Sequence, residues 1–242
     1  MKRLLGLSAV VAVALWVTGC QMISGTPSAE TILAKMEKAT NPEHKLASIK
    51  TSVFTYNSIS NDKEKSELIV SLKSPSKIRF DLKDAAGKTV IGYDGKNGWE
   101  YSGGGLRSIV GKELDELKFQ AIYLAPDAKI SDLFAKTVLN GSEVVDGEDC
   151  WKLSGYPAAG FKVQPIIIYI SQSRNLLIET IEQQDNAGRM ETVVTLFRNY
   201  KMLDGVMTPH TIVTKTGGLA VTSELTAVKW NPVLSDSIFA KP

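Results

Sequence analysis

The side chains that could carry out metal or nucleophilic chemistry are few and far apart in this sequence of 242 residues. Its two histidines, His44 and His210, stand in different regions, and neither has a second metal ligand at a useful spacing. The sequence contains no His-Glu-x-x-His, Gly-x-Ser-x-Gly or Cys-x-x-Cys pattern, the motifs of zinc proteases, hydrolases and thiol oxidoreductases. We therefore expect structural or surface histidines, no metal, no cofactor and no enzymatic activity.

Two polar segments could suggest a ligand but fit turns better. Asp146, Glu148 and Asp149 resemble calcium ligands, yet the ring of oxygen ligands is incomplete and an Asp-Gly turn accounts for Asp146. Residues 102–111, SGGGLRSIVG, lack both the glycine spacing and the lysine of a phosphate-binding loop. We interpret both segments as hairpins.

Cys20 is the residue with the clearest chemistry. It follows Lys2, Arg3 and a mostly apolar run at 4–17, which is the pattern of an export signal. The run is shorter than the about 20 residues that a membrane-spanning helix needs. Residues 17–20, Val-Thr-Gly-Cys, resemble the lipobox of bacterial lipoproteins, in which the thiol is joined to diacylglycerol and the chain is cut before it. The resemblance implies that Cys20 is the lipid attachment site and opens the mature chain.

The expected anchor places the protein in the bacterial cell envelope. Two or more acyl chains, at about 0.8 kcal/mol per buried CH2, hold a protein on a membrane that it does not span. By the rule for enteric lipoproteins, Gln21 in place of aspartate favours the outer membrane, facing the periplasm. We expect a signal peptide at 1–19, a tether at 20–27 and a single folded domain at 28–242.

Charge and cysteine content further limit the class of protein that the sequence can encode. Once residues 1–19 are removed, the 26 acidic residues are balanced by an equal number of Lys and Arg, which argues against a nucleic-acid partner. With Cys20 acylated, Cys150 has no partner for an internal disulfide. We expect Cys150 to be a small buried residue in a strand rather than a reactive thiol.

Most of the elements that position these residues are predicted strands. Apolar and polar residues alternate in SELIVSLK (66–73) and KIRFDL (77–82), as in half-buried antiparallel strands. Turn-forming Gly, Asn and Asp separate the segments. Alternation of this kind continues at 166–170, 176–184, 190–200, 207–216 and 219–230.

Two regions have helical spacing instead. Residues 28–40 place Ile32, Leu33 and Met36 on one stripe after a Ser28 or Thr26 cap. Residues 111–136 predict a helix and then a shorter one after Pro126. Because a large amphipathic sheet cannot leave its apolar face in water, we expect a curled sheet partly covered by these helices.

Five segments together resemble the superfamily of outer-membrane lipoprotein-sorting proteins, the LolA/LolB-like carriers and receptors, over most of residues 28–242. The resemblance implies a mainly β fold with a few helices: an unclosed antiparallel β-barrel of about ten to eleven strands, covered by helices over an apolar cavity for acyl chains. The segments are VIGYDGKNGWEY (90–101), LNGSEVVDGEDCWKL (139–153), IYISQSRNLLIE (168–179), NYKMLDGVMTPHTI (199–212) and VKWNPVLSDSIFAKP (228–242).

This sequence departs from the family pattern at two places. The soluble carrier commonly has an arginine that helps latch the lid, and Ser74 stands at the matching position before Pro75. The receptor exposes an apolar residue on a protruding loop, for which Leu106 is only a loose analogue.

The apolar strand faces are the candidate binding site. From the pattern alone they would suit a closed core, since most apolar stripes are core; the family resemblance favours a lipid-binding cavity instead. The candidate residues are Leu68, Val70, Leu72, Ile78, Phe80, Leu82, Ile91, Tyr93, Trp99 and Tyr101.

Two hypotheses of function follow. The first is a non-enzymatic, lipid-anchored protein that binds lipid or lipoprotein acyl chains in lipid or lipoprotein trafficking. The second keeps the fold but binds an envelope protein partner without a lipid, as a structural or sensory module.

Overall fold

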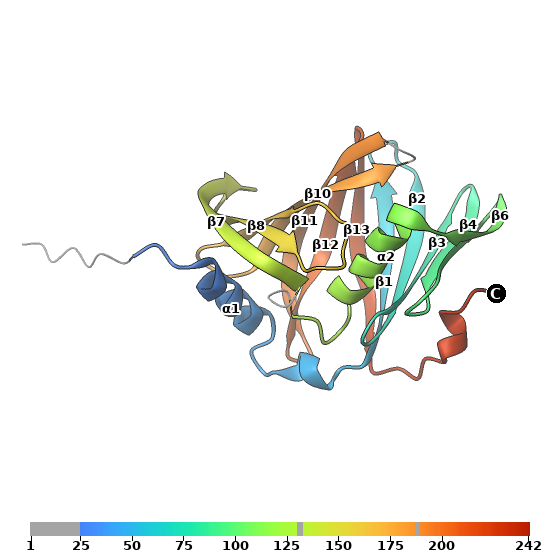
Figure 1. Ribbon diagram of the computed structural model, residues 1–242, viewed down its shortest axis with the longest axis horizontal. Helices are drawn as coiled ribbons and strands as arrows, with labels where there is room; N and C mark the ends of the chain where they lie inside the picture. The colour runs from blue at the N-terminus through green and yellow to red at the C-terminus, as the bar shows by residue number, and fades with distance from the viewer. Residues whose placement is uncertain (1–24, 130–132, 187–188) are drawn as a thin grey trace, which may run out of the picture.

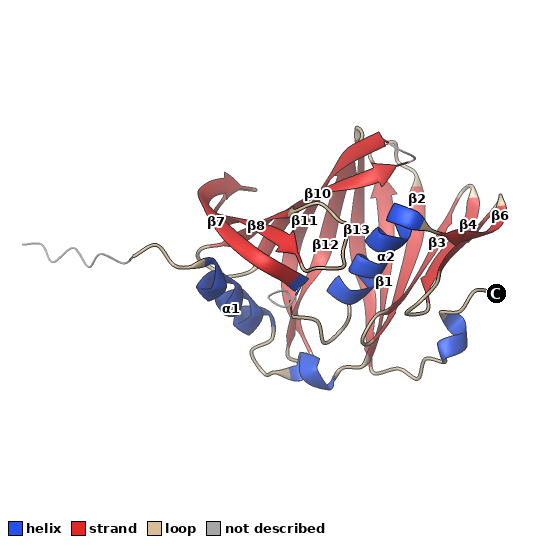
Figure 2. Cartoon of the chain, viewed as in Figure 1, coloured by secondary structure: helices blue, strands red, loops and turns tan. Residues whose placement is uncertain are grey.

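The computed structural model describes residues 25–129, 133–186 and 189–242 (Figure 1). The expected signal peptide, Cys20 and most of the expected tether lie outside the described residues. The described part is a single curled antiparallel sheet with two α-helices and two short 3-10 helices (Figure 2). The predicted fold class is therefore confirmed, with thirteen strands in place of ten to eleven. Among the described helices, none is long and apolar enough to cross a membrane.

The sheet is open because its two end strands, β6 and β7, do not pair with each other. All neighbouring strands are antiparallel, in the order β6-β5-β4-β3-β2-β1-β13-β12-β11-β10-β9-β8-β7. The strands are β1 (Thr51–Ser60), β2 (Lys65–Lys73), β3 (Lys77–Asp84), β4 (Gly87–Tyr93), β5 (Gly98–Ser102), β6 (Gly105–Ile109), β7 (Phe134–Val145), β8 (Glu148–Pro157), β9 (Ile166–Ser171), β10 (Leu177–Asn186), β11 (Arg189–Leu203), β12 (Val206–Thr216) and β13 (Leu219–Trp230).

Both α-helices lie on one side of the sheet, which we call the inner face (Figure 1). Helix α1 (Ala29–Thr40) begins at Ser28, whose hydroxyl accepts a hydrogen bond from the Thr31 amide at 3.2 Å, and it buries the predicted apolar stripe. Helix α2 (Gly111–Tyr123) crosses the middle of the sheet. The shorter helix predicted after Pro126 overlaps residues 130–132, outside the described part, and Phe134 already belongs to β7.

The part of the core between the helices and the inner face consists of two apolar clusters. One joins α1 and Phe119 of α2 to β7, β8 and β9. The other joins α2 to β1, β2, β3 and β4. The opposite, outer face is crossed by the C-terminal segment after β13, which contains the 3-10 helix η2 (Asp236–Ile238) and the fully buried Phe239. The remaining 3-10 helix, η1 (Lys45–Ser48), links α1 to β1.

Candidate functional site on the inner face

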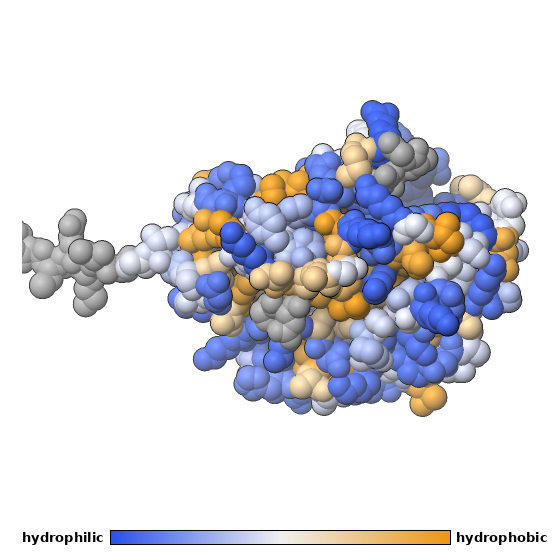
Figure 3. Space-filling model, viewed as in Figure 1, coloured by the Kyte–Doolittle hydropathy of each residue, from blue (hydrophilic) through white to orange (hydrophobic). Residues whose placement is uncertain are grey.

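The strand registers place apolar side chains in rows across the inner face of β1–β4. Phe54 pairs with Val70, Val70 with Phe80, and Phe80 with Ile91. Directly paired residues point to the same side of a sheet, so these four side chains form one row. The space-filling view shows apolar surface beside α2, over β3 and β4 (Figure 3).

Eight of the ten predicted site residues share this face. Val70, Leu72, Ile78 and Tyr93 are buried in the cluster that contains Leu117 and Ala121 of α2. Leu68, Phe80, Leu82 and Ile91 are only half-buried, although the same registers place them on the inner face. The site therefore has a closed part under α2 and a partly open part beside it.

The predicted positions of Trp99 and Tyr101 are wrong, because both lie on the outer face. The β4–β5 hairpin pairs Tyr93 with Gly98 and Gly92 with Trp99, which turns Trp99 away from the inner row. Its indole packs on Gly92 and donates a hydrogen bond to the Phe239 carbonyl at 2.8 Å. Tyr101 pairs with Leu106, and both remain largely exposed at the tip of the β5–β6 hairpin.

Sequence reasoning missed several inner-face residues, among them Phe54, Tyr56, Ile212 and Leu225. Strand β1 alternates Phe54, Tyr56 and Ser58 with outward residues, so its period-two pattern could have revealed the first two. Leu225 joins the site only because β1 pairs with β13, far along the chain, and Ile212 joins it because β12 pairs with β13.

The segment after α2 is tied to the sheet at the position where the family resemblance implies a latch arginine. Ser74 donates a hydrogen bond from its hydroxyl to Asp127, and the Lys50 ammonium lies 2.8 Å from the same carboxylate. Burial raises the pKa of Asp127, but these two donors outweigh it and leave the pKa below its usual range. Ser74 thus forms a link between the sheet and the segment after α2, without an arginine.

A half-buried glutamate, Glu182, lies at the other side of α2. Glu182 of β10 and Glu116 of α2 line a small cavity of about 20 Å³ together with Phe119, Gln120 and Ile166. Burial raises the pKa of Glu182, and the charge of Glu116 raises it further. Within the described part of the chain, no three His, Cys, Asp or Glu side chains are grouped to hold a metal ion.

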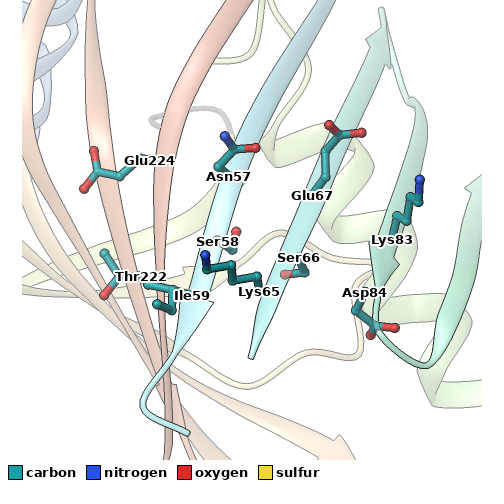
Figure 4. A pocket seen from close by; sticks show the side chains of 10 residues that line it. All are labelled: Asn57, Ser58, Ile59, Lys65, Ser66, Glu67, Lys83, Asp84, Thr222 and Glu224. Carbon is teal, nitrogen blue, oxygen red and sulfur yellow. The ribbon is translucent and has the colours of Figure 1, made fainter. Parts of the chain in front are cut away.

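A much larger groove, of about 690 Å³, lies away from the predicted site (Figure 4). It runs along the ends of β13, β1, β2 and β3, and its row of Glu224, Asn57, Glu67 and Lys83 belongs to the outer face. The groove is open and mixes both signs of charge, so it suits an acyl chain less well than the inner face does.

An open antiparallel half-barrel whose inner face is covered by helices is the LolA-like fold, and solved structures share it. A LolA superfamily protein from Nitrosomonas europaea matches with a TM-score of 0.58 and 17% identity, over 89% of this chain and 99% of the other. A DUF1329 family protein from Desulfovibrio piger matches with a TM-score of 0.57 and 16% identity, over 89% and 98%.

A third match is an outer membrane lipoprotein-sorting protein domain from Vibrio parahaemolyticus, with a TM-score of 0.53 and 12% identity over 86% of this chain and 95% of the other. No protein-family model matches the sequence, and no curated protein sequence is a significant match. At these identities the matches establish the fold, and the site must be argued from this chain's own residues.

Proposed function

We propose that the protein is a non-enzymatic, lipid-anchored envelope protein that binds the acyl chains of lipids or lipoproteins on the inner face of its sheet. The observation that carries the proposal is the partly covered apolar row beside α2, formed by Phe54, Phe80 and Ile91 around the buried Val70. Its fold is shared with proteins described as lipoprotein-sorting.

Hydrophobic transfer supplies the driving force for this binding. A tail of about 14 to 16 carbons gains roughly 10 kcal/mol on leaving water, at about 0.8 kcal/mol per CH2. Against a membrane the same tail gains almost nothing, because both environments are apolar. The protein would therefore exchange lipid with membranes without an energy source. Because side chains of α2 occupy the inner cluster, we expect α2 to move aside when a chain binds.

A charge on the inner face tests the site. Phe80→Glu should abolish binding of a fluorescent fatty acid and leave the melting temperature within a few degrees of wild type, because the half-buried position can be hydrated. Ile59→Glu is the matched control, since Ile59 lies in the outer groove and is 43% exposed. If Ile59→Glu lost binding and Phe80→Glu did not, the result would place the binding site in the outer groove. Absence of dye binding by the wild type would refute the proposed function and favour the protein-partner hypothesis.

The anchor is tested separately at Cys20. Cys20→Ser should abolish incorporation of labelled fatty acid and leave the protein uncleaved or released from the membrane. Label that persists in the variant would place acylation elsewhere. Membrane retention without label would indicate an uncut signal segment instead of a lipid anchor.

A further inference from the structure

Three threonines form a continuous row across the inner face of the second half of the sheet. Thr180 of β10 pairs with Thr195 of β11, and Thr195 pairs with Thr214 of β12. Side chains at directly opposed positions have β-carbons about 4.5–5.5 Å apart, so each threonine side chain lies beside the next in the row. On its other side Thr180 pairs with Ile168, which packs in the α1 cluster, and this fixes the row on the inner face.

The hydroxyl groups of this row have no hydrogen-bond partner among the described residues. Thr180 is 3% exposed, and Thr195 and Thr214 are half-buried. Among the described residues, the fully buried polar side-chain atoms without a partner are Ser52 Oγ and Trp230 Nε1, so the threonine hydroxyls are not sealed off from a ligand. The neighbouring inner-face hydroxyls differ, since Ser58 and Ser223 bond each other at 2.7 Å. The threonine row is therefore a set of unused donors and acceptors inside the half-barrel.

Charges near the row are mainly negative. Glu182 lies two residues further along β10, on the same face, and Glu116 of α2 shares its small cavity. Glu191 of β11 accepts a hydrogen bond from the Thr216 hydroxyl at 3.4 Å. A cation in this region is Lys112, at the start of α2, whose ammonium contacts the Met190 sulfur at 3.1 Å. Carboxylates that are partly desolvated repel a bound anion. These neighbours therefore disfavour binding of a ligand that carries a phosphate or carboxylate group.

The threonine row also adjoins the apolar part of the inner face. Ile212 stands two residues before Thr214 on β12 and packs against the cluster of Val70 and Leu72. A molecule lying along the inner face would thus meet apolar side chains over β1–β4 and hydroxyl groups over β10–β12. That arrangement matches an amphiphile with one tail region and one polar region.

We propose that the threonine row binds the neutral head group of an acyl lipid, namely glycerol or sugar hydroxyls and ester oxygens, while the tail lies on β1–β4. This inference rests on the proposed function and adds the class of ligand. Hydroxyl side chains can both donate to ester oxygens and accept from head-group hydroxyls, whereas a plain hydrocarbon would leave them unpaired.

The test compares three pyrene-labelled probes of equal chain length: a monoacylglycerol, a fatty acid and an alkane. The wild type should prefer the monoacylglycerol to each of the other two by on the order of tenfold. In the triple variant Thr180→Val, Thr195→Val and Thr214→Val, the preference over the alkane should fall to near unity, because valine keeps the shape and removes the hydroxyls. Thr222→Val, on the outer face of β13, is the matched control and should retain the preference.

The outcomes separate this inference from the proposed function. A triple variant that melts like the wild type and keeps the full preference would overturn the head-group site, while binding of the probes would leave the acyl-chain function standing. Tighter binding of the fatty-acid anion than of the monoacylglycerol would also overturn it. If the wild type bound none of the three probes, the proposed function and this inference would both fail.

Discussion

At the scale of single residues, Cys150 shows how burial decides chemistry. Its side chain is fully buried on the outer face in a cluster with Tyr169 and Ile178. Desolvation, together with the charge of Glu148, raises the pKa of the thiol to about 11. The thiolate that reacts with electrophiles is therefore scarce at neutral pH, in agreement with the structural role expected from the sequence.

We predict that Cys150 does not react with a thiol reagent until the protein unfolds. Cys150→Ala should cost at most about 1 to 2 kcal/mol of stability, from a small buried volume, and should not alter lipid binding. Reaction with a colorimetric thiol reagent in native and denaturing buffer, on the Cys20→Ser background, measures the first expectation. Rapid labelling of the native protein, or loss of binding in a folded Cys150→Ala variant, would contradict the structural role.

At the scale of elements, helix α2 is the part of the structure that controls access to the inner face. Leu114, Leu117 and Ala121 hold it against β1–β4, while Phe119 joins the cluster of α1. Val110, the residue before the helix, provides no side-chain cap, and the segment after the helix is tied through Asp127 to Lys50 and Ser74. The ion pair of Arg107 in β6 with Glu113 links the first part of the helix to the sheet as well. A helix fixed by a narrow apolar stripe and by a few exposed polar links is suited to act as a lid.

We predict that Asp127→Ala loosens this lid. The variant should lose about 1 to 2 kcal/mol of stability, exchange the amide hydrogens of α2 faster and bind a fluorescent lipid with a higher association rate. Asp62→Ala, at an exposed turn, removes the same charge and should change none of these. Unchanged hydrogen exchange in α2 would show that the link does not hold the lid.

The link through Asp127 also predicts how the attachment of α2 depends on pH. Because the pKa of Asp127 lies below its ordinary value of about 3.9, its contribution is complete above that value and is lost as the pH falls through the lowered pKa. Hydrogen exchange of α2, corrected for intrinsic rates, should therefore rise in acid for the wild type. Asp127→Ala should show a smaller rise over the same range.

At the scale of the whole molecule, the C-terminal segment fastens the outer face. Phe239 is fully buried, and its carbonyl accepts from Trp99. The Ile238 carbonyl accepts from Arg79 at 2.8 Å. Asp236 lies 2.7 Å from the Lys73 ammonium and 2.8 Å from that of Lys77. The chain end thus bridges β2, β3 and β5 on the side opposite the lid.

We predict that Phe239→Ala is among the most destabilising single changes in the protein. Removal of a fully buried phenylalanine typically costs about 3 to 5 kcal/mol, a large part of a margin of about 5 to 15 kcal/mol. Val233→Ala is the control within the same segment, since Val233 is fully exposed. Chemical denaturation of both variants provides the measurement, and equal midpoints would show that the segment does not contribute to the fold.

The sequence by itself determined the local periods of the chain. Alternation identified Leu68, Val70 and Leu72 as one face of a strand, and helical spacing identified α1 and α2, because each pattern depends only on neighbouring residues. The tertiary structure decided everything that depends on register and long-range pairing. A change of one residue in register reverses every side chain of a strand, which is why Trp99 and Tyr101 lie on the outer face. The threonine row exists only because β10, β11 and β12 pair in one register, and no local pattern carries that information.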